Sequence, residues 1–171
     1  MGGKDKKKRK GSLVQWVHEM ISINLETDRA CPLIAVELVN DAMQDFLEAI
    51  FRANNAPQEL QNNLLTAFAA PLYSFAMRVA ICRAFGLLPA ALCEQMTSLR
   101  KIRNHCGHAK AVVSLDDEEI QQWVRALQDF VQVYRNYKRL PRPRKAIEVA
   151  CDIIRHEIYD EMRSLQSSSK V

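Results

Sequence analysis

Residues 26–53 read "ETDRACPLIAVELVNDAMQDFLEAIFRA", and this stretch decides the fold class of the chain. Apolar residues recur in it every three or four positions, which places them on one face of an α-helix. That apolar stripe consists of Ala35, Leu38, Val39, Ala42, Met43, Phe46 and Ile50. Thr27 and Asp28 are both suitable N-cap residues ahead of it. The stretch therefore predicts a long helix with one buried face.

The other segments follow the same helical pattern. Proline suits the first turn of a helix and glycine suits its end. On these signals we expect further helices over residues 13–21, from Pro57, from Pro71 to Gly86, from Pro89 to about Gly107, from Ser114 or Asp116 to Lys138, and from Arg144 to Leu165. No strand-like alternation of useful length occurs. The 171 residues suit one domain, so we predict an all-α, single-domain bundle of six or seven helices.

The charge of the chain is concentrated at its start. Residues 1–10 hold six of the 24 basic groups and one of the 20 acids, so they carry +5, whereas the remaining 161 residues carry 18 − 19 = −1. Residues 1–10 have too little apolar surface to bury in a core. We expect residues 1–11 to form a disordered basic tail, residues 12–165 the helical domain, and residues 166–171 a frayed C-terminus.

Five consecutive basic residues of this tail carry the candidate nucleic-acid contacts: Lys6, Lys7, Lys8, Arg9 and Lys10. Three interpretations stay open: a solvated arm, a nucleic-acid-binding arm with salt-dependent and sequence-independent affinity, and a nuclear localisation signal by composition. No helix-turn-helix, zinc finger or RNA-stacking motif occurs, so nothing in the chain indicates sequence-specific recognition of DNA or RNA.

The cysteines and the hydropathy pattern bear on the compartment. Five cysteines are scattered through the chain without a CxxC motif, which favours reduced, buried thiols over a disulfide framework. The most apolar stretch, residues 67–88, is interrupted by Arg78 and Arg83. Its uninterrupted apolar segments are too short to span a membrane. We therefore expect a cytoplasmic protein without a membrane span.

Residues 100–110, "RKIRNHCGHAK", hold the densest group of chemically active side chains. Arg103 offers a planar fork for phosphate oxygens, and His108 titrates near neutral pH. Five positions along a continuous helix correspond to about 140° of rotation, so the two side chains would diverge. They converge only if the helix ends before His108. Because glycine leaves a helix easily, we predict that Gly107 ends it.

A structural role for the same arginine competes with a catalytic one. Arg103 falls at the edge of the predicted apolar stripe of its helix, and Glu37 lies within the apolar run "LIAVELV". A structural ion pair of Glu37 with Arg103 or Arg78 would satisfy these charges without any catalysis. We predict that Arg103 is largely buried and paired with Glu37 first, or with Asp116 or Asp117.

A metal site in this stretch is the weakest interpretation. The candidate ligands His105, Cys106 and His108 are nearly adjacent, and no fourth ligand accompanies them. Zinc sites need three or four ligands at spaced positions. We therefore expect no metal and no cofactor.

Three segments, residues 33–51, 71–89 and 99–120, occur in the order and spacing of the bacterial mannitol operon repressor family. The third, "LRKIRNHCGHAKAVVSLDDEEI", resembles that family's Ile-Arg-Asn…His motif and the helix start that follows it. The resemblance covers roughly residues 30–125. It implies a regulatory protein that represses transcription by binding a protein partner or DNA, which favours a non-enzymatic role and leaves an endoribonuclease of HEPN type as the enzymatic alternative.

Arg103, Asn104 and His108 also match the Arg-Asn-x-x-x-His signature of HEPN domains. Many HEPN proteins are metal-independent ribonucleases and usually dimeric, while others bind nucleotides or are inactive scaffolds. This second resemblance keeps two alternatives open: a ribonuclease or toxin that uses these three residues, and a scaffold domain without catalysis. It also implies a homodimer.

Overall fold

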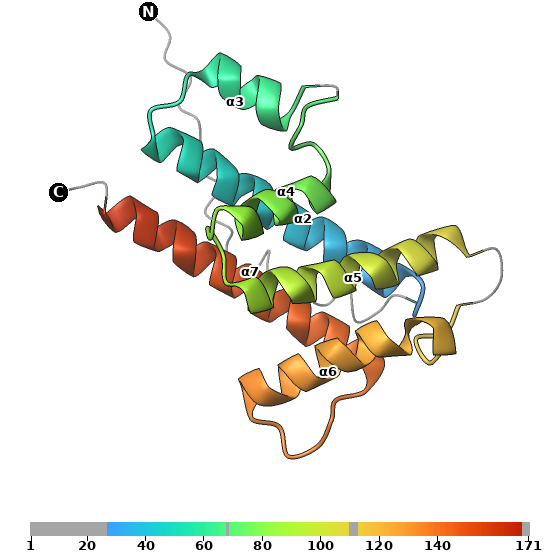
Figure 1. Cartoon of the computed structure of the whole chain (residues 1–171). Coiled ribbons are helices and arrows are strands. Elements are labelled where there is room, and N and C mark those ends of the chain that lie inside the picture. Colours follow the sequence, from blue (N-terminus) through green and yellow to red (C-terminus); the bar gives the residue numbers. More distant parts are fainter. Residues whose placement is uncertain (1–26, 68, 110–112, 169–171) are drawn as a thin grey trace, which may run out of the picture.

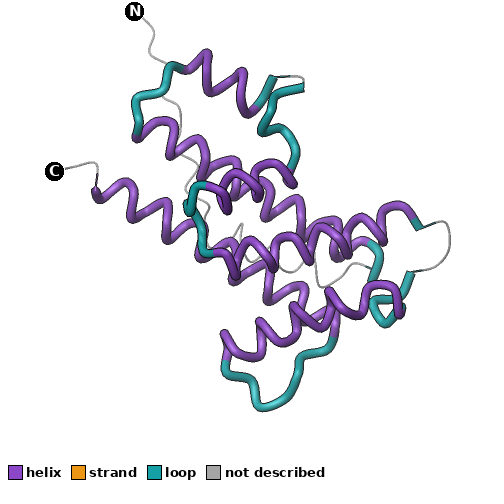
Figure 2. Tube along the Cα trace, viewed as in Figure 1, coloured by secondary structure: helices purple, strands orange, loops and turns teal. Residues whose placement is uncertain are grey.

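The protein is a bundle of α-helices, seen here in a computed structural model that describes residues 27–67, 69–109 and 113–168. Within these ranges it contains six α-helices and no strand (Figures 1 and 2). The helices are α2 (Ala30–Ala53), α3 (Gln58–Leu65), α4 (Phe75–Ala84), α5 (Ala90–His108), α6 (Gln121–Arg135) and α7 (Pro143–Ser168), with a short 3-10 helix, η1 (Glu118–Ile120), before α6. The predicted all-α fold class is confirmed.

Helix α2 is the centre of the bundle. It packs most extensively on α7 and also contacts α3, α4 and α5 (Figure 1). Five residues of its predicted stripe are at most 1% exposed: Ala35, Val39, Ala42, Met43 and Phe46. Leu38 and Ile50 are only partly buried against this core. The hydrophobic stripe that predicted the helix thus also fixes its orientation in the bundle.

Helix α7 provides the opposite side of the core. All five apolar residues of its predicted stripe are fully buried: Ile147, Ala150, Cys151, Ile154 and Ile158. Glu148 is also buried, and its carboxylate lies 3.6 Å from Arg144 Nε and 3.2 Å from Lys145 Nζ. The helix continues to Ser168, three residues beyond the predicted end. None of the helices described here is long and apolar enough to cross a membrane.

Helix α4 begins at Phe75, four residues later than predicted from Pro71. The cause is local: the Ser74 hydroxyl accepts a hydrogen bond from the backbone N–H of Met77 at 3.3 Å and caps the first turn. Gly86 follows the helix with a φ of +63°, in the left-handed region that the sequence pattern assigned to a helix-ending glycine.

The prediction that Gly107 ends α5 is wrong. The helix runs through Gly107 to His108, and Ala109 leaves it in an extended conformation. Ile102 and Cys106 are fully buried and hold the last turns of α5 against the core. This packing outweighs the low helix propensity of one glycine, which amounts to about 1 kcal/mol.

The predicted basic tail, with Lys6, Lys7, Lys8, Arg9 and Lys10, and the predicted helix over residues 13–21 lie outside the described residues.

Candidate functional site

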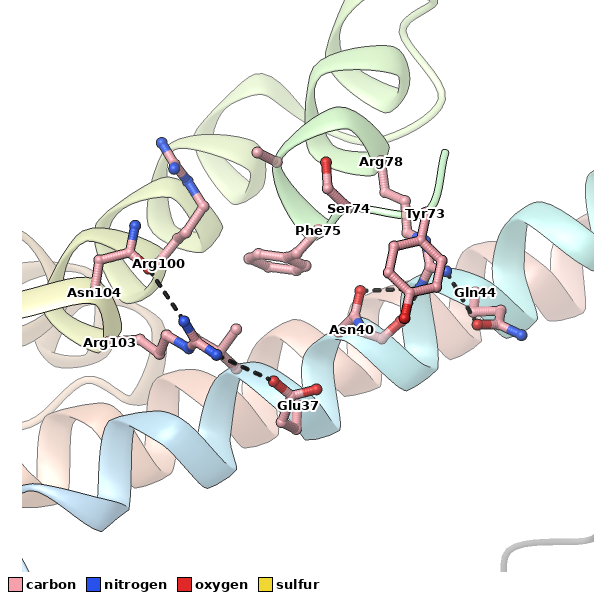
Figure 3. A pocket seen from close by; sticks show the side chains of 12 residues that line it. Glu37, Asn40, Gln44, Tyr73, Ser74, Phe75, Arg78, Arg100, Arg103 and Asn104 are labelled. Atoms are coloured by element: carbon pink, nitrogen blue, oxygen red, sulfur yellow. Dashed lines mark hydrogen bonds and ion pairs between the residues drawn. The ribbon is translucent and has the colours of Figure 1, made fainter. Parts of the chain in front are cut away.

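A cavity of about 540 Å³ opens between α2, the start of α4 and the middle of α5 (Figure 3). Most of its lining is polar or aromatic, which distinguishes it from the apolar core beneath. The lining residues are Val36, Glu37, Asn40, Gln44, Tyr73, Ser74, Phe75, Ala76, Arg78, Arg100, Arg103 and Asn104. Four of the sequence-predicted site residues therefore meet here: Glu37, Arg78, Arg103 and Asn104.

Arg78 is the buried arginine of this cavity, with only 2% of its surface exposed. Its Nε donates to the carbonyl of Leu72 at 2.7 Å, and its Nη1 donates to the Asn40 carbonyl at 3.1 Å and to Asn40 Oδ1 at 2.9 Å. Its Nη2 donates to Gln44 Oε1 at 3.0 Å. Figure 3 shows the bonds to Asn40 and Gln44, which join α4 to α2.

All of these acceptors are neutral oxygens. The proposed pairing of Arg78 with Glu37 is therefore not formed in the structure, where Glu37 faces Arg103. Burial lowers the pKa of the Arg78 guanidinium, and the more distant carboxylates, Asp41 foremost, oppose this shift. The positive charge of Arg78 is thus held next to the cavity without direct neutralisation.

Arg103 lies at the other end of the cavity. Its Nη2 is 3.7 Å from Glu37 Oε1, and its Nη1 donates a long hydrogen bond of 3.4 Å to Asn104 Oδ1. The side chains of Arg103 and Glu37 are 36% and 62% exposed. Arg103 is thus less buried than predicted, because the core beneath it is filled by its helix neighbours Leu99, Ile102 and Cys106. An ion pair this exposed contributes about 0–1 kcal/mol.

Arg100 is a partly buried arginine one helical turn before Arg103. It lines this cavity and also a neighbouring one of about 200 Å³ between α4 and α5. Within the described part of the chain, its guanidinium has neither an ion pair nor a hydrogen bond. The 540 Å³ cavity thus carries three arginines and one carboxylate on its walls, a formal charge of 3 − 1 = +2.

The structure does not bring His108 to this cavity. His108 is exposed on the same unbroken helix as Arg103, five positions further on, and it is absent from the cavity lining. Because the helix continues through Gly107, the two side chains diverge by about 140°. The shared Arg103–His108 site that a turn at Gly107 would have formed is not present within one chain.

The residues weighed as metal ligands have other surroundings. His105 Nε2 lies 3.7 Å from Asp117 Oδ2, and His105 Nδ1 lies 3.3 Å from Glu119 Oε2, which links the end of α5 to η1. Asp117 thus faces His105 and not Arg103. Cys106 is fully buried, and burial raises the pKa of its thiol to about 11. Among the described residues, no cluster of three His, Cys, Asp or Glu side chains is placed to hold a metal.

A second surface feature lies beside the cavity, on the outer side of α4. Tyr73, Met77 and Phe85 are 62%, 45% and 72% exposed, and three exposed alanines extend this apolar surface: Ala76, Ala80 and Ala84. The 200 Å³ cavity borders it, with Val79 and Met96 among its lining and Arg83 and Arg100 as its charged groups. Tyr73, Ala76, Met77, Ala80 and Ala84 recur at helical spacing, and clustered exposed apolar residues mark interaction sites.

Sequence reasoning missed several residues of the 540 Å³ cavity: Asn40, Gln44, Tyr73, Phe75 and Arg100. A signal was present in α2, where Glu37, Asn40 and Gln44 recur at helical spacing beside the apolar stripe. Arg100 precedes Arg103 by three positions, which places both on one side of α5. By contrast, no pattern in the sequence indicated that the segment before α4 would close the cavity.

The fold and cavity define an all-helical bundle with an arginine-lined polar site, and one solved structure shares this fold. It is the X-ray structure of the MtlR–HPr complex from Escherichia coli, whose MtlR chain has a TM-score of 0.63 and 18% sequence identity to this chain. The superposition covers 83% of this chain and 96% of that chain. No known protein-family model and no curated protein matches the sequence.

Proposed function

We propose that this chain is a regulatory protein that represses transcription by binding a protein partner of the HPr kind. The observation that carries the proposal is the fold likeness, which spans nearly the whole of an MtlR chain solved together with HPr. The segments of residues 30–125 that resemble mannitol operon repressors favour the same class, although no family model matches the sequence.

The partner-binding surface that we propose is the exposed apolar side of α4, formed by Tyr73, Met77 and Phe85 with the alanines between them. Large exposed aromatic and methionine side chains are enriched in protein interfaces. The neighbouring arginines, Arg83 and Arg100, would form a charged rim around this apolar centre.

A protein partner is better supported than direct contact with DNA. Outside residues 1–10 the chain carries a net charge of −1. Phosphate contacts supply most of the affinity of DNA-binding proteins, and a near-neutral body offers little of it. The ribonuclease alternative has less support, because Arg103 and His108 diverge on one unbroken helix.

Titration calorimetry of the full chain with purified HPr tests this function. We expect saturable binding with a Kd of about 10 µM or tighter. The variants Met77→Lys and Phe85→Ser should each weaken it about tenfold or more. Val133→Ser is the matched control, because Val133 is 82% exposed on α6, and it should bind normally.

Two results would count against the proposal. Absence of binding at about 200 µM of each protein would remove HPr-type proteins as the partner. Equal losses in the α4 variants and in Val133→Ser would move the contact away from α4.

A further inference from the structure

We propose that the 540 Å³ cavity is a binding site for a small organic phosphate, a phosphate monoester whose dianion is held by Arg100 and Arg103. This ligand site adjoins the partner surface on α4 and shares Tyr73, Ala76 and the rim residue Arg100 with it, but the binding of a small phosphate does not require the protein partner. The volume of the cavity is within the range of small-molecule sites, which span roughly 300–1,000 Å³.

Charge is the first observation that favours a dianion. The walls carry +2 in total, from Arg78, Arg100 and Arg103 against Glu37. Arg78 contributes a buried charge that only neutral oxygens contact. A charge held in this way keeps much of its field, because little water screens it.

The placement of the two other arginines is the second observation. Arg100 and Arg103 are three positions apart on α5, so their Cβ atoms are about 5–6 Å apart. Two flexible guanidinium groups at this spacing can bind the same phosphate, each offering a fork of N–H donors. In Figure 3 both side chains start from α5 on one side of the Phe75 ring, with Arg103 turned toward Glu37 and Arg100 turned away from it, so Arg100 has to rotate to share a ligand; Arg78 lies on the other side of the ring.

The remainder of the lining indicates an organic molecule in place of free phosphate. The Phe75 ring offers an apolar surface in the middle of the view, and neutral polar side chains surround it (Figure 3): Asn40, Gln44, Tyr73, Ser74 and Asn104. Such groups match hydroxyl or carbonyl groups of a ligand. Inorganic phosphate would leave these walls without a partner.

Glu37 is the expected competitor of the ligand. Its carboxylate lies 3.7 Å from Arg103, although 62% of the Glu37 side chain is exposed. The pair is therefore weak enough for a phosphate to displace it. Replacing the carboxylate with a neutral amide should then strengthen phosphate binding, which a purely structural Glu37–Arg103 pair would not produce.

The concave shape of the site favours a small molecule over an acidic segment of a protein. The three arginines all line one cavity formed by α2, α4 and α5. The apolar residues at α4 are by contrast exposed: Tyr73, Met77 and Phe85.

The test is calorimetric titration of the full chain with glucose 6-phosphate at constant ionic strength, with glucose, inorganic phosphate and citrate as comparison ligands. We expect a Kd below about 1 mM for glucose 6-phosphate, at least fivefold weaker binding of inorganic phosphate and citrate, and no binding of glucose. Arg100→Gln and Arg103→Gln should each weaken binding about tenfold or more, and Glu37→Gln should strengthen it about threefold. Arg125→Gln, at an exposed ion pair on α6, should leave it unchanged.

Several results would overturn the proposal. These are no binding of glucose 6-phosphate at about 20 mM, equal affinity for inorganic phosphate, and binding that survives both arginine substitutions. A Glu37→Gln variant that binds more weakly would contradict the competitor role. If phosphates fail to bind while Arg103→Gln abolishes HPr binding, the cavity receives an acidic group of a protein partner and the small-molecule site is refuted.

Discussion

At the scale of single residues, burial separates two arginines, Arg78 and Arg103, that the sequence does not distinguish. Arg78 is 2% exposed and makes four hydrogen bonds to α2 and the segment before α4, whereas Arg103 is one-third exposed and has one weak ion pair. The stabilising arginine is therefore Arg78, although the sequence pattern pointed to Arg103. The apolar run around Arg78 contains one of its acceptors, the Leu72 carbonyl, but its other acceptors, on Asn40 and Gln44, lie on α2.

We predict that Arg78→Met lowers the free energy of unfolding by about 3 kcal/mol, because it leaves buried acceptors of Asn40 and Gln44 without donors. Arg103→Met should cost at most about 1 kcal/mol, as expected for an exposed pair. Urea denaturation followed by circular dichroism measures both. Similar losses in the two variants would show that burial does not distinguish them.

Because of the buried cysteines, the free energy of unfolding depends on pH in the alkaline range. Burial raises the thiol pKa to about 12 for Cys31 and Cys82 and to about 11 for Cys106, from an ordinary value of 9.0. A raised folded-state pKa means that this stability is complete below pH 9. It is lost as the pH rises toward 12, because the unfolded chain ionises first.

We therefore expect the free energy of unfolding to fall between pH 9 and pH 10 by about 1 kcal/mol for each of these thiols. Cys82→Ala should reduce the fall between the two pH values by about 1 kcal/mol, the contribution of one thiol. The cavity left by the smaller side chain lowers the free energy of unfolding equally at both pH values. Urea denaturation at the two pH values measures the slope. An unchanged slope in Cys82→Ala would mean that Cys82 ionises in the folded protein as readily as in the unfolded chain.

At the scale of elements, helix stripes were predictable, whereas only some helix ends were, such as the glycine stop at Gly86. The stripes of α2 and α7 follow from periodicity, because burying one face needs only the spacing of apolar residues. The ends depend on contacts that are distant in sequence or on a single cap, as Ser74 shows for α4. Gly107 illustrates this dependence on distant contacts. Its low helix propensity predicts a turn, but the buried residues Ile102 and Cys106 in the last turns of α5 keep it helical.

Two glycine substitutions test this account of the helix ends. Gly107→Ala should raise the free energy of unfolding by about 0.5–1 kcal/mol, because Gly107 is helical and a Cβ there meets no atom within 4 Å. Gly86→Ala should lower it by about 1 kcal/mol, because φ is +63°. Thermal denaturation compares the two variants. Destabilisation by Gly107→Ala would restore the helix-ending role of that glycine.

At the scale of the whole molecule, the all-α fold class and part of the candidate site could be predicted from the sequence. Four candidate residues were identified from their own neighbourhood and line the cavity: Glu37, Arg78, Arg103 and Asn104. Asn40, Phe75 and Arg100 were not identified, because the cavity exists only once three helices pack. Their side chains are ordinary surface residues until the fold places them together.

Charge distribution gives a further prediction for the whole chain. Removing residues 1–10 changes the net charge from +4 to 4 − 5 = −1. Any affinity for RNA or DNA should then be lost, because six basic groups are removed together. Fluorescence anisotropy with a labelled oligonucleotide at several salt concentrations measures this. Unchanged affinity and salt dependence after truncation would place the nucleic-acid contacts on the helical body.

The central claim, that this bundle is a regulator working through a protein partner, is tested most directly by nuclear magnetic resonance. Unlabelled HPr is added to the ¹⁵N-labelled full chain, and the backbone amide shifts are followed. The account predicts saturable changes concentrated around Tyr73, Met77 and Phe85, with the distant end of α6 near Val133 unaffected. Spectra that stay unchanged at saturating HPr, or changes confined to other elements, would contradict it.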